Sequence, residues 1–318
     1  MQVAASKTIP FYGNGPYCYS NATSMMLASI GEKILPSEIE VYTAVGLGAF
    51  WLPKEKLLFF SSIASAPDKG ISRALQLLGF DFKETAADSP TKPPYDKLRS
   101  DLKESSAVLG PLDMGFLGHN PLHERMGGAD HFVLAYAMDE RGVSIHDPEG
   151  FPSVHLPFRR LEQAWKAEKI PYHRGYYRYW TRPNRSRRPA ADGLYTSLLQ
   201  TFREVYSEAE KIASAENLSI DGEAILTLAR HVKNEKVTPA ERGFMVFFSL
   251  KLGARRALDF ASFLEPRDPD LAEIKRIQSR LFGRCQSHAV QRDWNRLAGS
   301  LTELADTEKK FRDAIMDQ

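Results

Sequence analysis

Apolar residues recur at helical spacing soon after the start of the chain. The apolar positions that follow this spacing are Ala22, Met25, Met26 and Ile30. Residues three and four apart lie on one face of a helix, and glycine is common just beyond a helix end. The pattern therefore predicts a helix from about Cys18 to Ile30 that stops at Gly31.

Three more helical stretches are expected before the first clear strand. The segment PSEIEVYTAVG predicts a helix capped by Ser37 and ended by Gly46. The segment GISRALQLLGF predicts another at about residues 71–78, and YDKLRSDLKES predicts a third. The last of these leads into a predicted strand at residues 107–112.

Strand patterns dominate the next part of the chain. Two apolar runs, His131 to Met138 and Val143 to Asp147, flank the turn sequence DERG, which is typical of an antiparallel hairpin. A further run, GYYRYWT near residues 175–181, predicts a later strand of the same sheet. Helices combined with an antiparallel sheet indicate an α+β domain.

From about residue 194 onward only helical patterns remain. About five amphipathic helices are expected, and one opens with Thr238, Pro239 and Glu241. These residues form a capping box with proline at the first helical position. This half is interpreted as a helical bundle without chemistry, in which Cys285 and His288 pack rather than react.

A Pro- and Arg-rich stretch separates the two halves and is typical of a boundary. We predict a catalytic domain at residues 1–181, a linker at 182–193 and an all-α domain at 194–318. The basic run Arg182 to Arg188 is interpreted as part of the solvated linker.

Composition narrows the classes of function. The chain has 318 residues, of which 43% are hydrophobic and 26% charged, as is ordinary for a soluble globular protein. A net charge of +2 gives no electrostatic reason to expect a nucleic-acid partner. No apolar run approaches the ~18 residues of a membrane span, and no secretory signal is evident. Two cysteines do not make a disulfide framework, so we expect a cytoplasmic protein with reduced thiols and no membrane partner.

Cys18 is the first candidate for chemistry because it stands at a predicted helix start. Unpaired N–H groups and the helix dipole stabilise a thiolate there, which lowers the pKa of the cysteine. Gly15 and Pro16 would let the backbone turn and present the sulfur. The alternative is a small buried cysteine that only packs.

His131 and Asp147 strengthen the case for catalysis. His131 opens an apolar strand, and Asp147 closes the next one, before a proline. Their even separation keeps both side chains on one face of the sheet. A hairpin turn centred near Asp139 would place them directly opposite, whereas a turn centred at Arg141 would pull them apart. If paired, the carboxylate would orient the imidazole as in a catalytic triad.

These residues carry a family resemblance. A cysteine at a helix start, followed about 110 residues later by HFVLAY and IHDP, resembles the papain-like cysteine enzymes. The order Cys, His, Asp-Pro is similar to that of the double-glycine leader peptidases of bacteriocin export. The overall plan resembles the H-type acyltransferases of butirosin biosynthesis, a secondary-metabolic group with a papain-like N-terminal domain and a helical C-terminal one.

The resemblance covers about residues 8–180. It implies a papain-like fold with the N-terminal helix packed on an antiparallel sheet. It also implies that Cys18 is the nucleophile, His131 the base and Asp147 the orienting carboxylate. The leader peptidases carry a glutamine about six residues before the cysteine, where this chain has Tyr12. Asn14 is the nearest carboxamide and is our candidate oxyanion donor.

A glycine-rich loop at residues 110–121 is the candidate acyl pocket. We expect Leu112, Met114 and Phe116 from this loop, together with Tyr17, to contact the substrate. The alternative is a buried connection with apolar filler.

The remaining polar candidates near these residues have structural interpretations. His119 and His123 are four apart, but Asn120-Pro121 argues against a helix there, so no metal site is expected. Asp130 competes for the orienting role, although adjacent side chains on a strand diverge.

A thiolate paired with histidine forms an acyl-thioenzyme, and the next nucleophile decides the reaction. The first hypothesis is acyl transfer or amide chemistry on a small metabolite or carrier-protein thioester. The second is a cysteine peptidase, and the third a catalytically silent binding protein. A small-molecule or peptide-like acyl substrate is expected as the partner, with an acyl-carrier protein as a second one, and no cofactor.

Overall fold

The computed structural model describes residues 9–13 and 17–318. Within these residues the chain forms two compact units. The first unit comprises the described part of residues 1–39 and residues 67–190. The second unit comprises residues 40–66 and 191–318.

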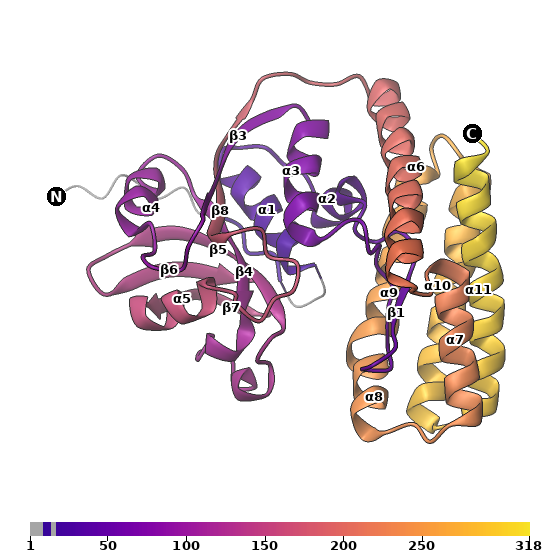
Figure 1. The fold of residues 1–318 in the computed structure, drawn as a ribbon. Coiled ribbons are helices and arrows are strands. Elements are labelled where there is room, and N and C mark those ends of the chain that lie inside the picture. The colour runs from indigo at the N-terminus through magenta and orange to yellow at the C-terminus, as the bar shows by residue number, and fades with distance from the viewer. Residues whose placement is uncertain (1–8, 14–16) are drawn as a thin grey trace. The chain divides into compact units, whose positions relative to one another are not determined.

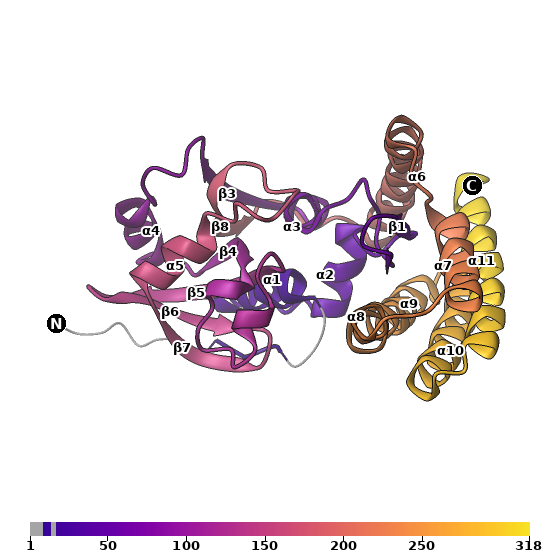
Figure 2. The ribbon, with the colours of Figure 1, turned by 60° about the horizontal axis from the view of Figure 1, so that its bottom comes forward.

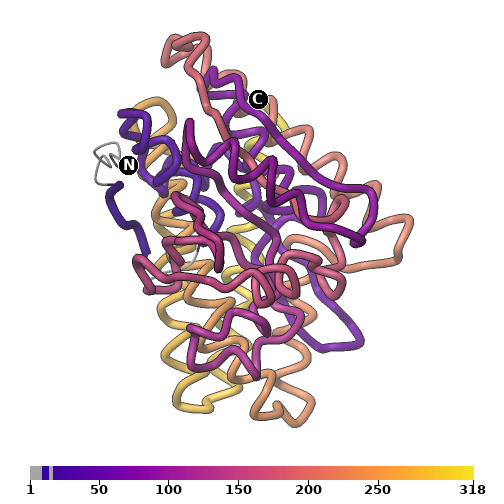
Figure 3. Tube along the Cα trace, turned by 90° about the vertical axis from the view of Figure 1, so that its left-hand side faces the viewer, coloured from indigo at the N-terminus to yellow at the C-terminus, as the bar shows by residue number. Residues whose placement is uncertain are grey.

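The first unit is built on a six-stranded antiparallel sheet (Figure 1). The strand order is β3-β8-β4-β5-β6-β7. The bounds are β3 Phe80–Ala87, β4 Ala107–Asp113, β5 Asp130–Met138, β6 Gly142–Asp147, β7 Phe151–Pro157 and β8 Tyr176–Arg185. Figure 3 shows the Cα trace from another side, coloured by residue number. Central strand β4 is buried at every residue, as expected for a strand covered on both faces.

Helices cover both faces of this sheet (Figure 2). The helices of the first unit are α1 Cys18–Ser29, α2 Pro36–Thr43 in part, α3 Pro67–Leu77, α4 Tyr95–Leu102 and α5 Phe158–Trp165. Adjacent residues of β5 face opposite ways. Phe132 meets Tyr19 of α1 edge-to-face at 6.0 Å between ring centroids, whereas Val133 belongs to the core that includes Trp165 of α5. The α+β class, with an N-terminal helix packed on an antiparallel sheet, is therefore confirmed.

The local patterns placed most elements well. Helix α1 begins at Cys18 and ends one residue before the predicted Ile30, and Gly31 follows at a φ of 90°. The Ser37 cap is wrong because α2 begins at Pro36, and α2 ends at Thr43 rather than near Gly46. The chain already leaves the helix at Ala44, whose φ is 53°. Strands β3 and β7 and helix α5 were not expected.

The basic run Arg182 to Arg188 is not simply a solvated linker. Strand β8 continues through Arg185, whose guanidinium forms two 2.8 Å hydrogen bonds with Glu32. Arg182 lies 2.7 Å from the buried carboxylate of Asp101. Arg182 and Arg185 are thus held in the folded unit by carboxylates, which a count of basic residues does not show.

The second unit is a helical assembly with one small hairpin. Its helices are α6 Ala191–Glu216, α7 Asp221–Asn234, α8 Pro239–Phe244, α9 Leu250–Leu264, α10 Pro269–Gln291 and α11 Trp294–Met316. The predicted helices and the capping box of Thr238 and Glu241 are confirmed. A π-helix, Met245–Ser249, lies between α8 and α9 and interrupts the helix that was predicted to open with Thr238 and Pro239.

Residues 40–66 belong with these helices, although they lie inside the predicted catalytic domain. They carry the hairpin of β1 (Phe50–Leu52) and β2 (Leu57–Phe59). The Trp51 N–H donates to Ser219 O at 3.1 Å, and Arg256 of α9 donates to buried Glu40 at 2.8 Å. These contacts join residues far apart in sequence, which hydrophobic periodicity does not reveal.

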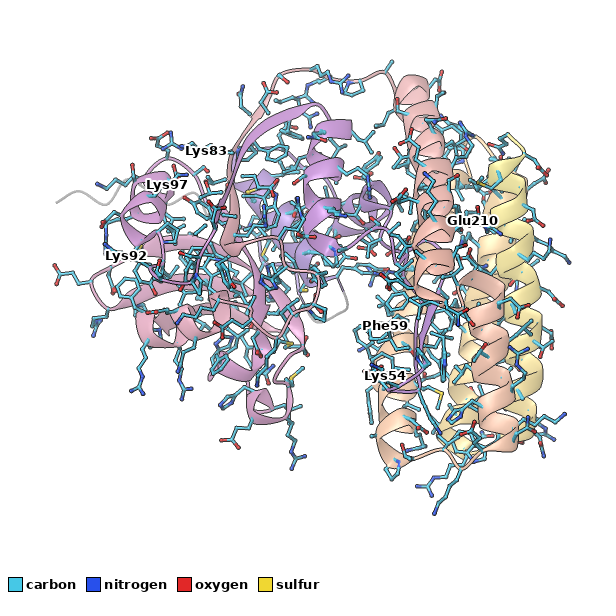
Figure 4. The ribbon with its side chains drawn as sticks, in the orientation of Figure 1. Lys54, Phe59, Lys83, Lys92, Lys97 and Glu210 are labelled. Carbon is cyan, nitrogen blue, oxygen red and sulfur yellow. The ribbon has the colours of Figure 1, made fainter. Side chains whose placement is uncertain are left out.

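Side chains on the surface of each unit show further links between elements (Figure 4). In the first unit, Lys97 of α4 donates to Thr85 of β3 at 2.9 Å. In the second, Glu210 of α6 pairs with Arg312 of α11. In the described residues, no helix is both long and apolar enough to cross a membrane.

Candidate active site

Cys18 is the first residue of α1, and its backbone surroundings present the thiol at a helix start. Tyr17 caps the helix in the left-handed conformation, with φ 79° and ψ 46°. Its carbonyl accepts both the backbone N–H and the side-chain amide of Asn21, at 2.8 and 3.0 Å. The first turn contains no acidic residue. Residues Tyr19 to Leu27 are all buried, so the half-buried Cys18 stands at the end of a helix fixed in the core.

His131 joins Cys18 to Asp147. Its Nε2 lies 2.6 Å from Asp147 Oδ1, and its imidazole also hydrogen-bonds the Cys18 thiol. Because Nε2 is taken by the carboxylate, Nδ1 is the nitrogen left for the thiol. The three residues are thus brought together as a Cys-His-Asp constellation.

The pairing between β5 and β6 differs from both registers considered above. Leu134 pairs with His146 and Ala135 with Ile145, a register centred at residue 140; after a register shift at Ala135/Ala137, the pairs next to the turn are centred between residues 140 and 141. The direct opposition of His131 and Asp147 is therefore wrong. They are diagonal neighbours on the same face, and an imidazole with a carboxylate spans that separation.

Asp147 is buried and accepts three hydrogen bonds. His131 and the Glu149 backbone N–H bind Oδ1 at 2.6 and 2.8 Å, and His119 Nε2 lies 2.6 Å from Oδ2. Burial alone would raise the pKa of this carboxyl. The charge of His131 and the three hydrogen bonds outweigh burial and hold the pKa well below its usual range.

The thiol and the imidazole affect each other's protonation. Burial lowers the pKa of His131, but Asp147 and Cys18 together raise it well above its usual value. Burial raises the pKa of Cys18, and His131 opposes this effect. The expectation of a lowered Cys18 pKa is therefore wrong, because loss of water outweighs the favourable position at the helix start.

Asp130 does not compete for the orienting role. Its Oδ2 accepts the Tyr172 hydroxyl at 2.5 Å. The neighbouring side chain thus has a partner of its own, which leaves Asp147 as the carboxylate of His131.

The structure places the other predicted site residues in different surroundings. Asn14 lies outside the described residues. Leu112 and Met114 belong to the buried core of the first unit, and Phe116 packs against it. This arrangement matches the alternative of a buried connection with apolar filler. Tyr17 is buried beside the nucleophile as the cap of α1.

His119 is the residue of the site that sequence reasoning missed. It was considered only as a metal ligand, yet it binds the carboxylate of Asp147 directly. In the described part of the chain, no group of three or more His, Cys, Asp or Glu side chains is arranged to hold a metal ion. No local pattern marks His119, since it comes to Asp147 through a loop closure.

Cys285, the other cysteine, has a different environment. It is fully buried in the core of the second unit, and burial raises its pKa to about 12. Its interpretation as a packing residue agrees with this place.

Comparisons with known proteins point to one family. A family model described as the YobF C-terminal domain matches residues 215–316. The uncharacterized protein YobF of Bacillus subtilis (strain 168) is 38% identical over 303 residues, which cover 95% of this chain and 96% of that protein. Among solved structures, a candidate C39-like peptidase from Bacillus anthracis covers 57% of this chain and 96% of its own. That match has 16% identity and a TM-score of 0.39, too low to assign an activity.

Proposed function

The chain belongs to the YobF family, and we propose that it is a cysteine-dependent hydrolase that cleaves an acyl bond through an acyl-thioenzyme. The observation that carries this proposal is the hydrogen-bonded series from the Cys18 thiol through His131 to Asp147. Residues that only pack in a core do not need to form a series of hydrogen bonds from a thiol through an imidazole to a carboxylate.

The tautomer supports a general-base role for His131. Ionised Asp147 can only accept hydrogen bonds, so His131 Nε2 carries a proton. In the neutral imidazole Nδ1 is then bare and takes the thiol proton as sulfur attacks the carbonyl carbon. The imidazolium returns that proton to the leaving group as the acyl-thioenzyme forms. Asp147 stabilises the imidazolium without taking its proton.

Water completes the hydrolase cycle. Neutral His131 removes a proton from water, the hydroxide attacks the thioester carbonyl, and the Cys18 thiol is regenerated with release of the acid. An amide or a thioester satisfies this chemistry. If an amine rather than water attacked the acyl-thioenzyme, the protein would act as a transferase. Acyl transfer from a carrier protein stays a prediction.

The test uses p-nitrophenyl acetate, a small activated ester that reports acylation by colour. We expect a burst of p-nitrophenol from the wild type and a single acetyl group on the peptide that contains Cys18. Cys18→Ala should lose the burst, with a fall of at least about a thousandfold in the acylation rate. Cys285→Ala is the matched control, because that thiol is buried in the second unit.

Retention of the burst by Cys18→Ala, or equal acetylation of the two cysteines, would contradict the proposal. The acyl-enzyme also separates the two reactions. If an added small amine leaves the rate of acyl release from Cys18 unchanged, hydrolysis is favoured. If the enzyme forms the amide faster than the uncatalysed reaction does, transfer is favoured.

A further inference from the structure

Asp147 receives more support than an orienting carboxylate needs for one histidine. His131 binds Oδ1, while His119 Nε2 binds the other oxygen, Oδ2, also at 2.6 Å. The carboxylate is therefore held from both ends, and it cannot pivot toward either partner without losing the other. The two histidines come from different elements, a strand end and a loop, so helical or strand spacing does not explain their convergence.

The loop that carries His119 is fixed at its base. Asp113 Oδ1 accepts the backbone N–H groups of Gly115 and Gly128, each at 2.9 Å. The Met114 N–H also donates to Ala129 O at 3.0 Å, which ties the two ends of the loop together. A Cβ on Gly115 would lie 2.8 Å from the Gly127 Cα, so the loop closes tightly there.

One hydrogen bond stabilises the turn beside His119, and one ring contact holds its side chain. Buried Asn120 accepts the Leu122 N–H at 2.9 Å, which stabilises the turn beside it. The His119 ring meets Phe151 at 5.5 Å between centroids, in an edge-to-face arrangement. Phe151 pairs with Asp147 across β6 and β7, so ring and carboxylate are fixed against the same pair of strands.

The hydrogen-bond partners of His119 indicate which of its ring nitrogens donates. Its Nε2 must donate, because ionised Asp147 has only acceptors. Its Nδ1 is buried and has no hydrogen-bond partner among the described residues. His119 therefore gives the Asp147 carboxylate a second hydrogen-bond donor through Nε2.

We propose that His119 is a positioning residue, which fixes the Asp147 carboxylate so that Oδ1 remains aligned with Nε2 of His131. This inference rests on the proposed function of Cys18 and His131. Without a donor at Oδ2, the buried oxygen loses its partner, and the carboxylate turns about the contact with Glu149. Asp147 then stabilises the imidazolium less well.

The experiment compares His119→Phe with His119→Gln. Phenylalanine keeps a ring against Phe151 but has no donor, whereas the glutamine amide can place an N–H near the position of Nε2. With p-nitrophenyl acetate, we expect acylation of Cys18 about tenfold slower in His119→Phe, the factor typical of one hydrogen bond to a charged group. His119→Gln should recover most of the rate. His123→Gln is the control, since His123 lies in the same loop and its Nδ1 hydrogen-bonds the Asn120 carbonyl, at 2.9 Å, rather than the Asp147 carboxylate.

A second readout distinguishes positioning from loss of structure. In the Cys18→Ala background, the titration of His131 is followed by NMR of labelled histidine, with and without His119→Phe. Positioning predicts a lower His131 pKa in the double variant and recovery with glutamine. An unchanged or higher His131 pKa, together with normal acylation in folded His119→Phe, would overturn the inference.

The two proposals fail in different ways. If Cys18→Ala acylates as fast as the wild type, the proposed function itself is wrong. If Cys18→Ala is inactive while His119→Phe matches the wild type in rate and in the His131 titration, only the role of His119 is wrong.

Discussion

Two buried carboxylates, one in each unit, lie in opposite surroundings. In the first, Asp147 is surrounded by donors and has a pKa well below its usual range. In the second, Asp221 is buried near the charge of Glu308, and burial followed by this charge raises its pKa to about 7. Its Oδ2 lies 3.3 Å from Arg312 Nε without a hydrogen bond. Burial alone therefore does not mark a catalytic carboxylate; the number and kind of donors around it do.

The two cysteines repeat the contrast. Burial raises the pKa of both, but Cys18 has a histidine that opposes the effect, whereas burial of Cys285 has no such opposition from a histidine. Both thiols are poor nucleophiles by desolvation alone. Our proposal places the chemistry at Cys18, the cysteine that has a histidine beside it.

Among the substitutions that test this comparison, Asp147→Asn has the largest expected effect. The amide keeps an acceptor for one histidine but presents an N–H to the other, and it removes the charge that stabilises the imidazolium. We expect acylation of Cys18 by p-nitrophenyl acetate to slow by about four orders of magnitude. The measurement is the burst rate of the folded variant.

Asp139→Asn is the matched control for that substitution. Asp139 also pairs with a histidine, His155, at 3.2 Å, but at the exposed turn between β5 and β6. It should leave the burst rate unchanged. A similar fall of the burst rate in both variants would show that loss of either Asp-His pair of this sheet impairs acylation. The contrast between Asp147 and Asp221 would then not explain the effect.

His131→Ala sharpens the comparison of the cysteines. Without the imidazole, burial is the dominant influence on the Cys18 thiol, so the pKa of Cys18 should rise further above its usual value. Alkylation by iodoacetamide at pH 8 should then slow about tenfold for each unit of pKa. Mass spectrometry of the two cysteine-containing peptides gives both rates in one sample.

His231→Gln tests whether any buried histidine has this effect. His231 is buried in the second unit and contacts Glu241 at 3.2 Å. It should leave Cys18 alkylation unchanged. Equal alkylation profiles for wild type and His131→Ala would mean that the imidazole does not influence the thiol.

The smallest expected effect is on stability, from Asp221→Asn. A carboxyl whose pKa is about 7 in the folded chain and near 3.8 when unfolded binds an extra proton only when folded. Its contribution is fully present below about pH 4 and is lost as the pH rises through 7. Asparagine cannot ionise and also tolerates the φ of 50° at this position.

We therefore expect Asp221→Asn to be more stable than the wild type by about 2 kcal/mol at pH 8, with a smaller difference at pH 5. Urea denaturation followed by far-ultraviolet circular dichroism measures the free energy of unfolding at both values. A difference independent of pH would assign the effect to the backbone conformation rather than to the charge.

Local sequence patterns predicted the elements whose causes are local. Helix α1, the capping box at Thr238 and the hairpin of β5 and β6 depend on periodicity, caps and turns within a few residues. Cys18, His131 and Asp147 became candidates for catalysis from their positions at the ends of such elements, and the family resemblance supplied their expected roles. The pKa of Cys18 could not be predicted this way, because burial depends on residues distant in sequence.

The sequence by itself determined that Cys18 starts a helix and that His131 and Asp147 face the same side of one hairpin. Only the tertiary structure decided the diagonal pairing of those two residues, the approach of His119 to Asp147 and the place of residues 40–66 among the helices of the second unit. The physical reason is range: helix and strand periods act between near neighbours, whereas these contacts form when distant segments close together and exclude water.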